Sequence, residues 1–251
     1  MRSRLAPTPS GYLHTGNVVN FLVIDAISRS LGATLTLRID DLDQPRVRDE
    51  YVADIFTTLE WLGIECHEGP RSGSELATWS QVTRIGLYRD ALDVLLAGPD
   101  VYPCMCTRSD WNGYSGSDCP GSCRQRVEAF EPGATSVRLH LEGQPDATLW
   151  RRDGIPAYHL ASVVDDDVTG VDVVVRGSDL EPSTVVQRRI SELLPGSTFQ
   201  QARVLHHPLI QANGRKLSKS TGAQAAPLVK SSQLKDELNA IARGFAADLG
   251  Y

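Results

Sequence analysis

Two short segments of the sequence carry residue types that suit phosphate chemistry. The downstream segment is basic, is flanked by glycines, and contains Lys216, Ser218 and Lys219. A lysine ammonium group is a compact cation that can stabilise a transferring phosphoryl group. Near the amino terminus, His14, Gly16 and Asn17 adjoin an apolar run, and a glycine before a helix lets the main chain approach a phosphate. Each segment alone is typical of an ordinary turn, but together they predict an attack on the α-phosphate of ATP.

The composition indicates a water-soluble enzyme. The chain has 251 residues and a formal net charge of -6, and this length is sufficient for a large core. The sequence contains no run of about 18 apolar residues and no apolar leader after Met1, so we expect a cytoplasmic, monomeric protein that does not contact a membrane. The acidic balance means that any nucleic-acid partner would require a local basic face.

Four of the five cysteines lie close together in the sequence, as Cys104, Cys106, Cys119 and Cys123. In a cytosolic chain, the pattern C-x-C followed by C-x-x-x-C points to a metal rather than to disulfides. Four thiolates can close a tetrahedral structural zinc site, with free or buried thiols as the alternative. Cys66 stands apart, and we expect it to be a core or surface residue without a role.

The order of elements predicts an α/β fold with a doubly wound parallel sheet. The pattern of apolar residues predicts strands over 2–7, 34–39, 136–141, 171–175 and 202–206, and helices over 16–31, 50–62, 80–97, 183–194 and 232–249. The first four of these elements in chain order read β-α-β-α, which is how a nucleotide-binding fold of the Rossmann type begins.

Changes in composition predict the domain boundaries. Residues 1–98 form the first half of the catalytic domain, and 99–150, rich in proline, glycine and cysteine, form an inserted zinc-binding domain. Residues 151–222 form the second half with the basic segment, and 223–251 form a short helical end with no anticodon-binding domain. Asp165–Asp167 could suggest a metal cluster, but we expect a solvated loop at the end of a strand.

Both phosphate-handling segments resemble the HIGH and KMSKS elements of class I aminoacyl-tRNA synthetases, and most closely those of the glutamate branch. The resemblance runs from Arg4 to about Ser220. It includes the segment from Trp150 to Gly154 and the run from Ala157 to Asp166. Within this branch, the chain most resembles the glutamyl-queuosine tRNA(Asp) synthetases. These short paralogues of glutamyl-tRNA synthetase are implied to activate glutamate with ATP and Mg²⁺ without tRNA. They then transfer the glutamate to queuosine at the wobble position of tRNA(Asp).

The resemblance also implies residue roles. Catalysis would fall to His14 and Lys219, and ATP would be bound by Pro7, His14, Gly16, Asn17, Lys216, Ser218 and Lys219. L-Glutamate would be bound by Arg4, Leu5, Ala6, Pro7, Thr8, Asp40, Tyr158 and Arg176. Within this set, Asp40 would hold the α-ammonium group and Arg176 the side-chain carboxylate. Independently of the family, a substrate with two carboxylates and one ammonium group requires guanidinium groups and one carboxylate.

The chain departs from the family pattern at Asp40, where the family has glutamate, and at Cys119, where it often has tyrosine. The shorter carboxylate at Asp40 could weaken glutamate binding or select a different amino acid. Two alternatives stay open. The chain could pass its activated amino acid to a carrier protein or small molecule, or it could be an idle paralogue that serves as a zinc-stabilised binding or regulatory module.

Overall fold

A computed structural model describes residues 1–107, 122–125, 129–212, 215–216 and 226–251. By packing, the chain divides into two compact units. The first unit comprises Met1–Thr83, Gly170–Glu181 and Gln201–Tyr251, and the second comprises Arg84–Thr169 and Pro182–Gln200. The expected domain boundaries stay a prediction. No helix in the described part of the chain is long and apolar enough to cross a membrane.

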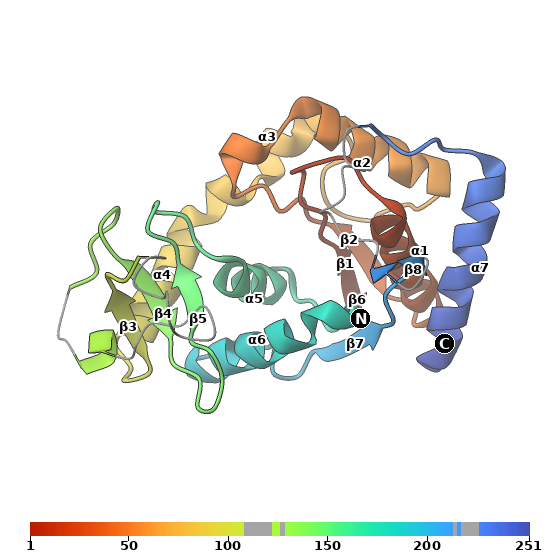
Figure 1. Cartoon of the computed structure of the whole chain (residues 1–251). Helices are drawn as coiled ribbons and strands as arrows, with labels where there is room; N and C mark the ends of the chain where they lie inside the picture. The colour runs from red at the N-terminus through yellow and green to blue at the C-terminus, as the bar shows by residue number, and fades with distance from the viewer. Residues whose placement is uncertain (108–121, 126–128, 213–214, 217–225) are drawn as a thin grey trace. The chain divides into compact units, whose positions relative to one another are not determined.

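The first unit contains a parallel sheet in the order β2-β1-β6-β7 (Figure 1). Its strands are β1 (Arg2–Leu5), β2 (Thr34–Leu37), β6 (Val173–Gly177) and β7 (Arg203–His207). Alternate residues of the central strands, such as Val173 and Val175, face one apolar core, as the period of two along a strand requires. The predicted parallel α/β fold is therefore confirmed.

Three helices cover this core, namely α1 (Thr15–Ser30), α2 (Asp49–Leu62) and α7 (Ser232–Asp248). α1 is apolar on nearly all sides, because it packs on the sheet with one face and against α7 with another (Figure 1). α7 contributes Leu238, Ala242 and Ala246, and the small side chains of the two alanines allow close approach to α1. The carboxyl-terminal segment is thus an integral part of the first unit.

Local signals explain where α1 and α2 begin and end. His14 is the N-cap of α1: its Nδ1 accepts from the Gly16 amide, while the Asn17 side chain accepts from the His14 amide. Past the other end of α1, Gly32 has a left-handed φ of 59°. α2 ends at Gly63, whose φ of 71° is also left-handed.

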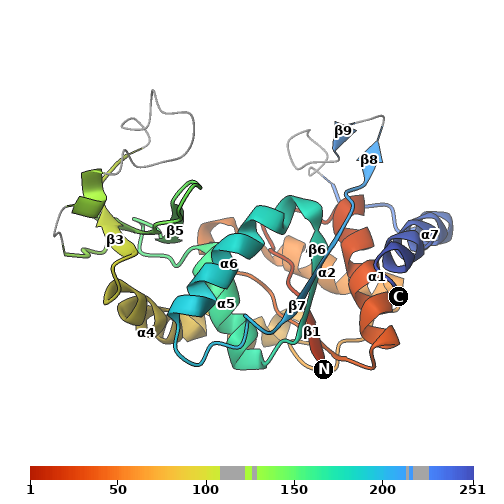
Figure 2. The same cartoon turned by 90° about the horizontal axis from the view of Figure 1, so that it is seen from below.

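The second unit combines helices with a small antiparallel sheet in the order β3-β4-β5. Its elements are α4 (Ile85–Leu96), β3 (Val101–Cys104), the 3-10 turn η5 (Ser122–Gln125), β4 (Ser136–Leu139), β5 (Ala147–Trp150), α5 (Tyr158–Thr169) and most of α6 (Glu181–Leu193). The remaining elements of the chain are short: η1 (Gln44–Arg46), η2 (Gly73–Glu75), α3 (Leu76–Trp79), η3 (Gln81–Arg84), η6 (Ser178–Leu180), β8 (Gln211–Ala212) and β9 (Arg215–Lys216). The β8–β9 hairpin follows β7 (Figure 2).

The solvated loop expected at Asp165–Asp167 is wrong. These residues lie in α5, where Leu160, Ala161, Val163 and Val164 form a buried apolar face. Asp165 is 1% exposed and accepts from Arg84 and Tyr88 at 2.7 and 2.8 Å. Asp167 accepts from the main-chain amides of Thr198 and Phe199. These carboxylates are structural because each holds a neighbouring segment.

Candidate active site

Candidate site residues of the first unit lie at the carboxyl-terminal edge of the parallel sheet, where its strands end. Ala6–Thr8 follow β1, Asp40 follows β2, and Arg176 lies at the end of β6. β1 pairs with β2 on one side and with β6 on the other. The strand that follows β1 in the chain therefore lies on one side of it, and the later strands β6 and β7 lie on the opposite side, which makes β1 and β6 a switch point. A doubly wound sheet binds its ligand at the carboxyl ends of the strands beside such a switch point.

A cavity of about 190 Å³ lies at this edge, within the first unit. Its lining residues include four that were predicted from the sequence: Ala6, Pro7, Thr8 and Asn17. The cavity is also lined by Gly11, Tyr12, Leu13, Asn20, Phe21 and Leu180. Predicted glutamate-binding and ATP-binding residues therefore share one cavity.

The capping contacts of His14 orient its ring. Because Nδ1 accepts the Gly16 amide at 3.1 Å, the neutral ring carries its proton on Nε2. Nε2–H is then the group that can donate to a phosphate oxygen. Gly16 permits this arrangement, since a Cβ atom there would lie 2.9 Å from Cε1 of His14.

Two arginines place positive charge inside the first unit. Arg4 on β1 is 6% exposed and Arg176 on β6 is 3% exposed. Burial, and then the charge of Arg176, lower the pKa of His206, which pairs with Arg176 in the sheet. A guanidinium group suits an anionic ligand, because it can donate two parallel hydrogen bonds to a carboxylate.

Asp40 is held by a neighbour that the sequence did not single out. Arg38 donates to both carboxylate oxygens of Asp40, from Nε at 2.6 Å and from a terminal nitrogen at 3.3 Å. Both side chains are largely buried, at 6% and 12% exposed. Arg38 therefore neutralises part of the charge that an ammonium group would meet, although a carboxylate has further acceptor positions.

The other predicted residues have different places. Leu5 is a core residue whose carbonyl accepts from the Arg38 amide. Tyr158 begins α5 in the second unit and is 41% exposed. Lys216 lies in β9, and Ser218 and Lys219 lie outside the described residues.

Sequence reasoning missed Asn20 and Asp54. Asn20 lies one turn beyond Asn17 on α1, so helical spacing could have identified it. Asp54 accepts from the Leu13 amide at 2.8 Å, a contact between α2 and the segment before α1 that no local pattern signals. His207 also contacts Asn20, at 2.9 Å, and stacks on Phe245 of α7.

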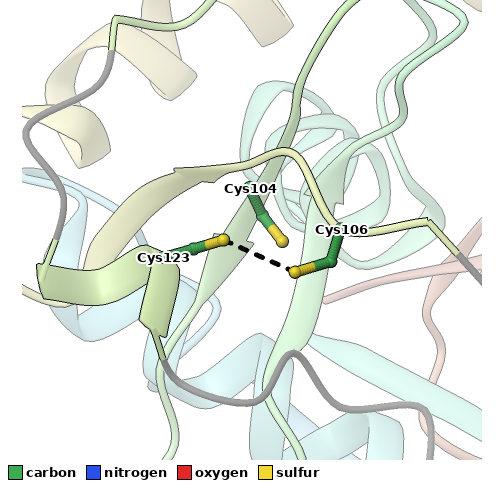
Figure 3. Close-up of side chains that lie close together, drawn as sticks. All are labelled: Cys104, Cys106 and Cys123. Atoms are coloured by element: carbon green, nitrogen blue, oxygen red, sulfur yellow. Dashed lines mark hydrogen bonds between the residues drawn. The ribbon is translucent and has the colours of Figure 1, made fainter. Parts of the chain in front are cut away.

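Three of the four clustered cysteines converge in the second unit (Figure 3). The sulfur atoms of Cys104, Cys106 and Cys123 lie within 4.8 Å of one another, and Cys106 and Cys123 are 3.5 Å apart. Tetrahedral zinc with bonds of about 2.3 Å separates its sulfur ligands by about 3.8 Å, so this arrangement fits zinc. Cys119 lies outside the described residues.

Cys66 is separate from the cluster and packs against the core of the first unit. Burial, together with the charge of Asp25, raises the pKa of its thiol to about 12. Burial thus disfavours the thiolate, which is the reactive form of cysteine, and the expectation that Cys66 has no role stays a prediction.

A basic cavity of about 590 Å³ adjoins the cysteines. It is lined by Arg138, Arg151 and Arg152, and also by Cys106, Thr107, Gly133, Ser136, Thr148 and Asp153. Arg152 donates to the main-chain carbonyls of Met105 and Cys106, which orient its guanidinium group without neutralising its charge. Arg151 pairs with Asp153, which also lines the cavity, so the three arginines leave an excess of positive charge there on a chain with a net charge of -6.

Comparisons with known proteins agree with this geometry. The family model described as tRNA synthetases class I (E and Q), catalytic domain, matches residues 1–127 and 123–244. A glutamyl-Q tRNA(Asp) synthetase of Nitratidesulfovibrio vulgaris is 35% identical over 87% of this chain and 78% of its own length. One from Pseudomonas aeruginosa is 36% identical over 89% of this chain and 79% of its own length.

The chain spans half of the longer relatives that it matches. A glutamate–tRNA ligase of Chlamydia trachomatis is 30% identical over 87% of this chain, but over 50% of its own length. A glutamate-tRNA synthetase structure from Elizabethkingia anophelis has the same fold, with a TM-score of 0.69 at 23% identity, over 90% of this chain and 54% of its own. The chain therefore belongs to the class I tRNA synthetases of the glutamate and glutamine branch, a family of ATP-dependent ligases, and within it to the glutamyl-Q tRNA(Asp) synthetase group.

Proposed function

We propose that this protein activates L-glutamate with ATP in the absence of tRNA and transfers the glutamate to queuosine in tRNA(Asp). The supporting observation is the cavity at the switch point of the sheet, where Pro7, Thr8 and Asn17 meet. The buried Arg4 and Arg176 occupy the same unit and favour an acidic amino acid. Relatives named glutamyl-Q tRNA(Asp) synthetase cover most of the chain.

In the first step, an oxygen of the α-carboxylate of glutamate bonds to the α-phosphorus of ATP, and the bond from that phosphorus to the oxygen that bridges it to the β-phosphorus breaks. Pyrophosphate leaves with both electrons of that bond. Nε2–H of His14 donates to a phosphate oxygen, and Lys219 stabilises the charge on the departing group. Mg²⁺, which accompanies ATP, neutralises phosphate charge.

In the second step, a hydroxyl oxygen of the acceptor attacks the carbonyl carbon of glutamyl-adenylate. AMP leaves, and the hydroxyl proton passes to solvent or to the departing phosphate. AMP is a good leaving group, so the step requires no protein nucleophile.

The test of the first step is glutamate-dependent exchange between ATP and pyrophosphate in the absence of tRNA. We expect exchange by the wild type and a fall of about a hundredfold in Lys219→Ala, because the ammonium charge acts in the transition state. Absence of exchange by folded wild-type protein would remove the activation proposal. Full activity of Lys219→Ala would remove the role of the lysine.

The basic cavity of the second unit supports tRNA as the acceptor. Guanidinium groups bind the phosphates of a nucleic acid, whereas a small neutral acceptor would not require them. Transfer of labelled glutamate should require tRNA(Asp) that carries queuosine. The double variant Arg151→Ala/Arg152→Ala should retain exchange, lose transfer by tenfold or more, and show a weaker dependence on salt. Equal transfer to tRNA lacking queuosine would contradict the proposed acceptor.

We also infer that Cys104, Cys106 and Cys123, completed by Cys119, hold a structural zinc ion. Zinc would tie β3 to the turn at Ser122–Gln125 and so stabilise the second unit. Metal analysis should find one zinc ion per chain, and a strong chelator should lower the melting temperature. A metal-free protein with an unchanged melting temperature would contradict this site.

A further inference from the structure

A buried carboxylate on α2 joins two segments that are far apart in the sequence. The side chain of Asp54 is 4% exposed. Its Oδ2 accepts from the main-chain amide of Leu13 at 2.8 Å, and its Oδ1 accepts from Nζ of Lys230 at 2.7 Å. Both oxygens are therefore occupied by donors from outside α2. All three residues belong to the first unit.

These partners flank the two phosphate-handling segments. Leu13 lines the cavity at the switch point and directly precedes His14, the N-cap of α1. Lys230 follows the segment that contains Lys219 and directly precedes Ser231, the N-cap of α7. One carboxylate thus links the main chain before His14 to the residue that precedes the N-cap of α7.

The chemistry of this link is sensitive to either partner. A carboxylate this deeply buried requires a cation and hydrogen bonds. Removal of the Lys230 ammonium group leaves the charge of Asp54 without its cation, so water or another donor must enter. The Leu13 amide shares that carboxylate, so the change passes directly to the chain beside His14.

We propose that Asp54 and Lys230 are positioning residues for ATP, which set the place of His14 through the main chain at Leu13. This inference rests on the proposed function, since it concerns the same ATP site. Neither side chain has to touch the nucleotide. A displacement of about 1 Å at a phosphate-binding group can reduce a rate by about a hundredfold.

The chain provides a matched control. Lys235, one turn into α7, also links α7 to α2, through a bond of 2.9 Å from Nζ to the carbonyl of Trp61. Trp61 lies in the last turn of α2, away from the Asp54 position in the sequence. Lys230→Met and Lys235→Met each remove one ammonium group that bonds to a residue of α2, but only Lys230 contacts Asp54.

The experiment measures ATP affinity by equilibrium titration, ATP–pyrophosphate exchange, and the unfolding midpoint for both variants. We expect Lys230→Met to weaken ATP binding and raise the KM for ATP by tenfold or more, with Lys230→Arg retaining most of the affinity. Lys235→Met should lower the midpoint without changing ATP affinity. Asp54→Asn, which keeps an acceptor for the Leu13 amide, should lie between wild type and Lys230→Met.

Equal ATP affinities in the two methionine variants would overturn the positioning role. If Lys230→Met fails to fold, Asp54→Asn decides the question, and wild-type ATP affinity in that variant would also overturn the proposal. The two proposals fail separately: wild-type protein that binds ATP without glutamate-dependent exchange contradicts the proposed function, while the affinities still test the role of Asp54 and Lys230.

Discussion

At the scale of single residues, the candidate site depends on contacts between close neighbours in the sequence. His14 is oriented by the amide of Gly16, and Asp40 is held by the guanidinium group of Arg38. Both contacts are local, but only the first belongs to the pattern from which the site was predicted. The second changes the expected role of Asp40, because its charge is already shared.

We predict that Gly16→Ala impairs exchange while the protein remains folded. The new Cβ would lie 2.9 Å from Cε1 and 3.0 Å from Nδ1 of His14, so the ring must move from the position in which Nδ1 accepts from the Gly16 amide. We expect a fall in kcat/KM of tenfold or more in exchange kinetics. Gly244→Ala in α7, where a Cβ meets nothing within 4 Å, is the control and should keep full activity.

Asp40→Glu should improve the use of glutamate as substrate. The extra methylene moves the carboxylate beyond Arg38 and restores the length found in the family pattern. We expect a lower KM for glutamate in exchange, by roughly tenfold, with the KM for ATP unchanged. An unchanged KM for glutamate would show that this carboxylate takes no part in amino-acid recognition.

At the scale of elements, each helix is held by a few specific side chains as well as by its apolar face. α5 is anchored to α4 by Asp165, whose carboxylate accepts from Arg84 and Tyr88. Burial lowers the pKa of Arg84, but the hydrogen bond to Asp165 and the charge of Asp165 more than offset burial, so the pKa of Arg84 is raised. Burial, and then the charge of Asp165, raise the pKa of Tyr88.

Arg84→Met should therefore destabilise the second unit. Asp165 is 1% exposed, and loss of its cation leaves a buried charge, which costs about 3 kcal/mol. Denaturant unfolding should show this loss. The double variant Arg84→Met/Asp165→Asn should recover part of it, because the uncompensated charge is gone. Equal stability of Arg84→Met and wild type would contradict the account of this pair.

At the scale of the whole molecule, the buried His207 and the half-buried His206 link stability to pH. Burial is the largest cause that lowers the pKa of both His206 and His207 from 6.5; Arg176 lowers that of His206 further, and the Pro208 carbonyl partly opposes the shift at His207. Between the pKa of the folded state and the unfolded value of 6.5, the unfolded chain binds more protons than the folded chain. The free energy of unfolding is therefore highest above pH 6.5 and falls as the pH drops toward the pKa values of the folded state.

We accordingly expect the melting temperature to fall between about pH 7 and about pH 5 and to be nearly constant from about pH 7 to about pH 8. The double variant His206→Gln/His207→Gln should show a flatter profile in that acidic window. Asp146 contributes at lower pH: burial raises its pKa, but hydrogen bonds from Tyr102 and His140 outweigh this and lower it. A wild-type profile without an acidic decline would contradict the histidine effect.

Much of the first unit could be predicted because its signals are local. Apolar periods of two and of 3.6 residues gave β1, α1, β2 and α2 within a few residues of their observed bounds. The predicted helix over 80–97 begins later, at Ile85, after a 3-10 turn. α5 was missed because its three aspartates suggested solvent, although its apolar face has helical spacing.

The sequence by itself determined the parallel α/β fold and the cysteine pattern, and it predicted the phosphate-handling segments, since each depends on residue types at short spacing. Only the tertiary structure decided which charges are buried and what holds them. It placed Asp54 between Leu13 and Lys230, and it brought Cys123 to Cys104 and Cys106. These contacts join residues that are distant in the chain, and the free energy of a buried charge depends on such partners rather than on its neighbours in sequence.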